Sequence, residues 1–152
     1  MKGPEVLGAL VLAGGLTVGI HAQQGEASKP KAPLVTAVGC ATRTPEGTWV
    51  LSNATDSTET AQLFSSSKEI EAAKKQALGR NRYTLLGTAD FASKEELLKT
   101  QQRAEFTRPE VANATGQLQN GKKIVVKGLL ITAPNEKRLN LVSVLQLADI
   151  CR

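Results

Sequence analysis

The chain has 152 residues, and 19 Lys and Arg against 14 Asp and Glu give it a net charge of +5 at neutral pH. This length fits one domain with a core of its own, after any leader is removed. Charges of both signs are interleaved without long basic runs. This pattern is not the signal of a dedicated nucleic-acid-binding protein, and the moderate basic excess predicts weak attraction to anionic polymers or membrane surfaces.

The first 22 residues have the pattern of a secretory signal. Lys2 precedes an apolar, glycine-rich run over 6–20, and Ile20-His21-Ala22 is a plausible cleavage site. The run is shorter than the roughly 20 apolar residues that a membrane span needs. We therefore expect a signal peptide over 1–22 and a secreted or periplasmic protein, which meets the membrane only transiently through this segment. A retained signal-anchor and a cytosolic helix are the alternatives.

The few histidine and cysteine residues limit the kinds of catalytic, metal-binding and disulfide chemistry that the chain can support. His21 is the only histidine, and it leaves with the signal segment. The remaining chain therefore has no imidazole for a nucleophile pair or a zinc site, and no metal or cofactor is expected. Cys40 and Cys151 are the only cysteines. An oxidising compartment favours one intramolecular disulfide between them, with two free thiols or an intermolecular bridge as alternatives.

The first half of the chain reads as a leader, two strands and a helix. Residues 23–33 are polar, contain two prolines and predict a flexible leader. Strands are predicted over 34–42 and 48–53, joined by a Pro-x-Gly turn. Ser66 and Glu69 form a capping box, which predicts a helix that runs to residue 78 and stops at glycine 79.

The second half begins with a strand over 82–86 and a helix over 93–104, opened by a second capping box. A strand over 123–131 contains Gly128, which suggests a bulge. The last strand, 138–148, has apolar residues on both parities, so both of its faces should be covered. One parity carries the leucines and the other the valines, and these residues are Leu139, Leu141, Leu145, Leu147, Val142 and Val144.

Five strands with a helix between the third and the fourth is the order of an OB-type barrel. We therefore predict a β-rich (α+β) domain over 34–152, a five-stranded OB-like barrel with helical insertions near 66–79 and 93–104. A small β-sandwich and a cystatin-like sheet remain alternatives.

Five segments carry a resemblance to a known group of proteins. They are "VTAVGC", "GTWVLSNAT", "YTLLG", "NGKKIVVKGLL" and "LNLVSVLQLADIC", in this order. Together they resemble small exported bacterial domains of uncharacterised function with an OB-like β-barrel. The resemblance implies the same fold and supplies no catalytic residues. It also implies that residues 57–81 and 90–119 are enlarged here.

Two aromatic residues and two basic clusters are candidates for a ligand face. Trp49 and Tyr83 lie on strands where an OB face stacks bases or sugars, although packing of the barrel or its hairpin is the more common role of such residues. An aromatic fraction of 3% argues against a platform for many bases. Anion binding is the hypothesis for the basic clusters, and a solvated face is the alternative. One cluster is Lys122, Lys123 and Lys127, and the other is Lys74, Lys75, Arg80 and Arg82.

These features favour an exported, non-catalytic binding or interaction module of the cell envelope. The expected partner is an envelope polymer or protein of unknown identity and not a specific nucleic acid; the oligomeric state is left open. One alternative is an envelope hydrolase with paired carboxylates, although helix capping explains the clustered glutamates. The other is a purely structural envelope component.

Overall fold

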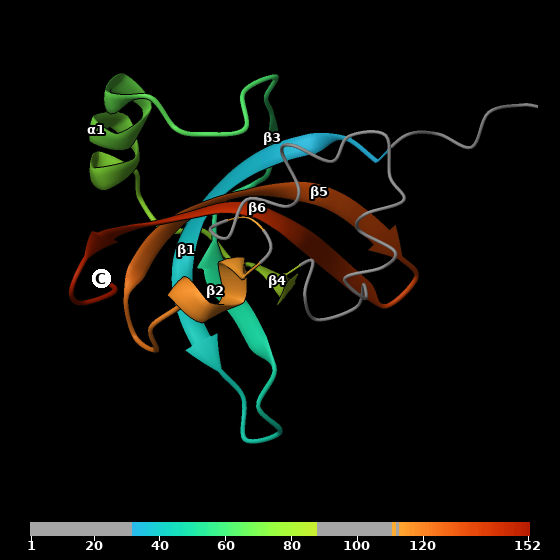
Figure 1. Ribbon diagram of the computed structural model, residues 1–152. Helices are drawn as coiled ribbons and strands as arrows, with labels where there is room; N and C mark the ends of the chain where they lie inside the picture. Colours follow the sequence, from blue (N-terminus) through green and yellow to red (C-terminus); the bar gives the residue numbers. More distant parts are fainter. Residues whose placement is uncertain (1–31, 88–110, 112) are drawn as a thin grey trace, which may run out of the picture.

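All five predicted strands are present, each within two residues of its expected ends. The computed structural model describes residues 32–87, 111 and 113–152 (Figure 1). Their elements are β1 (Leu34–Arg43), β2 (Trp49–Ala54), β3 (Thr58–Glu59), α1 (Ser67–Lys75), β4 (Asn81–Leu86), the 3₁₀ helix η2 (Ala114–Gln117), β5 (Lys123–Ala133) and β6 (Glu136–Ala148). The predicted signal segment, most of the leader and the predicted helix over 93–104 lie outside the described residues.

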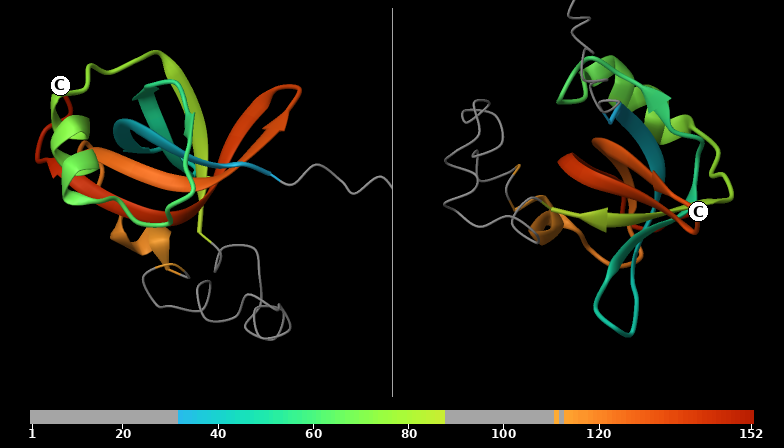
Figure 2. Two further views of the ribbon diagram at one scale, coloured as in Figure 1. Left: turned by 90° about the horizontal axis from the view of Figure 1, so that it is seen from above. Right: turned by 90° about the vertical axis from the view of Figure 1, so that its right-hand side faces the viewer.

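The described strands form one sheet, in which five strands close a ring (Figure 2). β1 pairs with both β2 and β5, β5 pairs with β6, β6 with β4, and β4 with β2. Every pair in the ring is antiparallel except β4 and β6, which run parallel. The short β3, which the sequence did not predict, pairs with the start of β1.

The hydrophobic core fills the inside of the ring. The inward residues alternate along the strands, and the short helix η2 adds Ala114 and Leu118 from one end. The buried strand residues of this cluster are Val35, Ala37, Ala41, Leu51, Ala54, Tyr83, Leu85, Ile124, Val126, Leu139 and Leu141. Because these side chains come from all five ring strands, the ring closes around a continuous apolar interior.

A bulge interrupts the β5–β6 pair where the sequence predicted one. Lys127 pairs with Ser143, and the next residue, Gly128, pairs with Leu141, so Val142 is an extra residue on β6. The absence of a side chain at Gly128 lets the two backbones approach, since a Cβ there would lie 2.7 Å from a carbonyl oxygen of β6. The glycine prediction is confirmed, with the extra residue on the neighbouring strand.

The bulge changes which residues of β6 face inward. Leu139 and Leu141 point into the core before it, and Val144 packs against the core after it. Leu145 and Leu147 therefore point outward, because side chains alternate along a strand. Leu145 is 38% exposed, and Leu147 packs against a second cluster beneath α1. The leucines of this strand, which share one parity in the sequence, therefore lie on both of its faces.

Helix α1 lies on the outside of the ring, where Ala73 packs against Val38 of β1 and Val125 of β5. Its capping box is confirmed, because Ser66 Oγ accepts from the Glu69 backbone and the Glu69 carboxylate accepts from the Ser66 backbone. The helix is shorter than predicted and ends at Lys75. The backbone becomes extended at residue 76. Glycine 79 therefore does not end the helix; it packs closely against the end of β2.

Candidate functional site

The predicted disulfide is present. Cys40 in β1 is bonded to Cys151, which follows β6, with 5.5 Å between their Cα atoms. The backbone of Cys151 also donates to the Gly121 carbonyl at 3.0 Å, which holds the C-terminal tail beside β5. The bond excludes the two alternatives, free thiols and an intermolecular bridge. Disulfides persist in non-reducing surroundings, so the bond indicates an environment such as an extracytoplasmic compartment.

Lys127 lies beneath the N-terminal end of α1 and has no exposed surface. Its Nζ donates to the Phe64 carbonyl and to Glu69 Oε1, both at 3.0 Å. The backbone of Ser66, then Lys127 and the Ser66 hydroxyl, all donate to the Glu69 carboxylate and lower its pKa to about 2. This lysine therefore fixes the start of the helix to the sheet.

Lys123 occupies the matching position at the other end of the helix. Its side chain is buried, and Nζ donates to the carbonyls of Lys74 and Gln76 at 3.0 and 2.9 Å. A cation here satisfies the unpaired carbonyls of a helix C-terminus. Lys122 instead pairs with Asp149 at 3.0 Å and lowers the pKa of that carboxyl group. The three predicted lysines thus do not share one open surface.

The two predicted aromatic residues lie in different surroundings. Tyr83 is 1% exposed inside the ring, and its hydroxyl donates to the Thr55 carbonyl at 3.4 Å. Trp49 lies at the rim, half-buried, and packs partly against the core. The guanidinium of Arg43 lies over its ring, 5.6 Å from the centroid. Tyr83 therefore packs the interior of the ring, and Trp49 borders a surface hollow.

The hollow beside Trp49 has a volume of about 600 Å³ and lies between the β1–β2 turn, the end of β4 and η2. Arg43 is oriented here by a hydrogen bond from its Nε to the Gly47 carbonyl at 3.4 Å. Glu46 lines the same hollow, and hydrogen bonds from its own backbone and the Thr44 hydroxyl lower its pKa. The walls are mostly polar and carry charges of both signs.

A second hollow, of about 460 Å³, lies between β4 and the tip of the β5–β6 hairpin. Its lining residues are Arg82, Thr84, Thr132, Ala133, Pro134, Asn135, Glu136 and Lys137. Arg82, Thr84 and Leu86 alternate along one face of β4, which we call the β4 face, and they connect this hollow to the one beside Trp49. The two hollows therefore form the ends of one strand-built surface.

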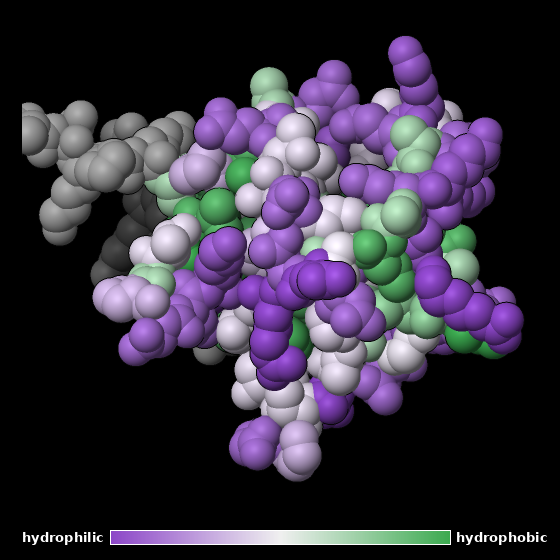
Figure 3. All heavy atoms as spheres, turned by 180° about the vertical axis from the view of Figure 1, so that it is seen from behind, coloured by the Kyte–Doolittle hydropathy of each residue, from purple (hydrophilic) through white to green (hydrophobic). Residues whose placement is uncertain are grey.

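Basic side chains without ion pairs gather near the second hollow. In the described part of the chain, Arg82, Lys137 and Arg138 form no salt bridge. Arg138 stands beside Thr84 in the β4–β6 pair, and its Nε is buried without a hydrogen-bond partner. Asn140 Oδ1, two residues further along β6, is also buried and unpartnered. Figure 3, which shows the molecule from behind, has strongly hydrophilic side chains across the middle of the view.

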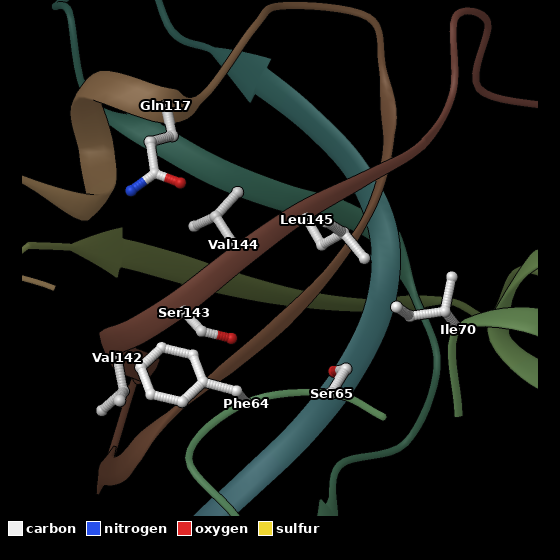
Figure 4. A pocket seen from close by; sticks show the side chains of 8 residues that line it. All are labelled: Phe64, Ser65, Ile70, Gln117, Val142, Ser143, Val144 and Leu145. Atoms are coloured by element: carbon white, nitrogen blue, oxygen red, sulfur yellow. The ribbon is translucent and has the colours of Figure 1, made fainter. Parts of the chain in front are cut away.

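An apolar hollow of about 260 Å³ lies on another side of the ring, between the segment before α1 and β6 (Figure 4). Phe64, which is 40% exposed, and Leu145 line it together with Ile70. The close-up shows the Phe64 ring beside Val142 and Ser143 of β6. Phe64 and Leu145, two exposed apolar residues, thus line the same hollow, apart from the β4 face.

Sequence reasoning found part of the basic surface and missed the rest. Arg82 was grouped with Arg80, Lys74 and Lys75, but Lys74 pairs with Glu71 on α1 at 2.7 Å. The actual neighbour of Arg82 in the hollow is Lys137, which follows the β5–β6 turn. The adjacent pair Lys137 and Arg138 was the available signal, and its position beside β4 depends on the parallel β4–β6 pairing.

The described carboxyl groups with a resolved pKa shift do not have the electrostatics of a general acid. Each resolved pKa shift in the described ranges, at Glu46, Glu69 and Asp149, is downward. A catalytic acid needs a raised pKa so that it keeps its proton near neutral pH. In the same ranges, no three His, Cys, Asp or Glu side chains are placed to hold a metal ion. No described helix is long and apolar enough to span a membrane.

Comparisons with protein-family models, with curated proteins and with solved structures find no match to this chain. The functional argument therefore rests on the residues themselves.

Proposed function

We propose that this protein is an exported, non-enzymatic binding module of the cell envelope, built on an OB-like barrel. The five-stranded ring, with hairpins β1–β2 and β5–β6, supports the barrel assignment. The disulfide, together with the apolar segment over 6–20, supports export. The bound partner is an envelope polymer or protein.

The β4 face is the observation that carries the binding role. It lies on paired strands and ends at a hollow on each side, one at the β1–β2 turn and one at the β5–β6 hairpin. Strands hold such a surface rigid, and loops at its two ends can adapt to a ligand. An elongated ligand that crosses β4 would therefore contact both hollows.

The test is a binding screen of the full chain, recovered from an exporting host, against immobilised envelope glycans and polymers. Thr84 lies in the centre of the β4 face, and Thr84→Phe should block it by bulk alone. Thr58→Phe places the same side chain on the exposed strand β3 as a matched control. We expect at least one polymer to bind the wild type and the control but not Thr84→Phe.

Three outcomes would contradict the proposal. One is the absence of any bound polymer or envelope protein, and another is binding that Thr84→Phe leaves unchanged. The third is release of soluble products from a bound polymer, because turnover would show an enzyme.

A further inference from the structure

We propose that the hollow between β4 and the β5–β6 hairpin binds an acidic sugar unit, so that the ligand is an anionic polysaccharide. This inference rests on the proposed binding function and names its ligand class. It follows from the charges around the hollow and from the polar groups of its walls.

The charge around the hollow is positive. Arg82 and Lys137 line it, and Arg138 lies on the neighbouring strand beside Thr84. None of these cations has a salt-bridge partner in the described structure, whereas Lys122 and Lys127 are both paired with acids. Glu136 is the single acid among the residues that line the hollow. The net field at this place attracts an anion.

Two buried atoms nearby require partners of opposite kinds. Arg138 Nε is a donor without an acceptor, and Asn140 Oδ1 is an acceptor without a donor. Both side chains stand on the same face of β6, because they are two residues apart in a strand. Buried polar atoms normally have partners. Neither residue is among those that line the hollow, so the two atoms mark unsatisfied polar groups in the strand beside it.

The surrounding groups favour a sugar over a nucleic acid. Single-stranded nucleic acid is held by aromatic stacking as well as charge. Tyr83 is buried in the core, and Arg43 lies over the Trp49 ring. The hollow instead offers the hydroxyls of Thr84 and Thr132 and the amide of Asn135, which are suited to sugar hydroxyls. The guanidinium group of Arg82 suits carboxylate or sulfate oxygens.

The experiment measures binding of the full chain to polygalacturonate, dextran sulfate, neutral dextran and single-stranded DNA at fixed ionic strength. The site variant is Arg82→Gln with Lys137→Gln. The matched control is Lys68→Gln with Lys75→Gln, which removes the same charge from exposed positions on α1. We expect the site variant to bind the acidic glycan about tenfold more weakly and the control to bind like the wild type. All four changes are at exposed residues, and melting curves verify that both variants are folded.

The outcomes distinguish the acidic-sugar site from the more general proposal of a binding module, and they identify the acid group. Binding to polygalacturonate but not dextran sulfate assigns the acid as a carboxylate, and the reverse assigns a sulfate. Equal weakening of the two variants, or DNA binding as tight as glycan binding, would show general attraction of polyanions and overturn the acidic-sugar site. Binding to neutral dextran without binding to either acidic glycan would overturn the site and leave the binding module standing. If none of the four polymers binds, the acidic-sugar site is overturned, and the envelope screen alone then decides the binding role.

Discussion

Replacing Lys127 with methionine tests how α1 is held on the ring. The lysine is fully buried, and its two hydrogen bonds reach the Phe64 carbonyl and the Glu69 carboxylate. Methionine has a similar length and fills the same space without a charge. The substitution therefore removes the two polar contacts and leaves the packing beneath the helix largely intact.

The expected loss of unfolding free energy is about 1–3 kcal/mol. A hydrogen bond to a charged group contributes about 1.5–3 kcal/mol, and two are lost. The cost of burying an ammonium group, which is several kcal/mol in proteins, disappears as well and offsets part of this. Glu69 is 40% exposed, so water can solvate its carboxylate after the change. The opposite variant, Glu69→Gln, leaves the ammonium buried beside a neutral group and should be the more damaging of the two.

Urea unfolding at several pH values measures both effects. The pKa of Glu69 is lowered in the folded state from 4.5 to about 2. Its stabilising contribution is therefore complete above pH 4.5 and is lost as the pH falls toward 2. Lys127→Met removes one cause of the lowered pKa, so its stability should fall less steeply over this range than that of the wild type. Equal stability at pH 7, or identical slopes between pH 5 and 2, would refute the reasoning.

Three further substitutions test other parts of the structure. Cys40→Ser opens a loop that spans 111 positions to Cys151 and should lower the unfolding free energy by about 5 kcal/mol in the chain-entropy model; unchanged thermal melting would contradict this. Gly128→Ala should also destabilise, because its Cβ would lie 2.7 Å from the Asn140 carbonyl oxygen, and chemical denaturation that matches the wild type would disprove the close approach. Trp49→Ala should lower the melting temperature because the ring packs against the core, whereas unaltered melting with weakened binding would give it a ligand role.

The ring strands were predictable because their signals are local. β-branched runs, a Pro-x-Gly turn and the glycine of β5 all act within a few residues, and each predicted strand is present. The capping box of Ser66 and Glu69 marked the start of α1 for the same reason. The disulfide was also predictable, since Cys40 and Cys151 are the only two cysteines in the chain.

Features that depend on contacts between distant elements were not predictable. The outward turn of Leu145 follows from the extra residue at Val142, whose position is set by the pairing with β5. Lys123 and Lys127 look like ordinary solvated lysines in the sequence, because their neighbouring residues do not indicate that a helix packs above them. Strand β3 has only two residues and pairs through its backbone, so no side-chain pattern in the sequence indicates it.

The candidate site was only partly predictable for the same reason. Arg82 was recognised as basic, but its partner Lys137 is more than fifty positions away and comes near through the β4–β6 pairing. Trp49 was correctly placed on a strand, whereas its contact with Arg43 depends on the register of the β1–β2 hairpin, which pairs these two residues. Spatial neighbours across a sheet cannot be read from local residue patterns.

Backbone NMR of the full chain, titrated with short oligogalacturonates, tests the central claim most directly. If an acidic sugar binds in the hollow of the β4 face, the amide signals of Arg82, Thr84, Arg138 and Asn140 should shift together, in a saturable manner. The signals of α1 should stay in place, because the helix lies on another side of the ring. Shifts confined to α1 or spread evenly over all exposed lysines would contradict the claim, as would a spectrum that does not change.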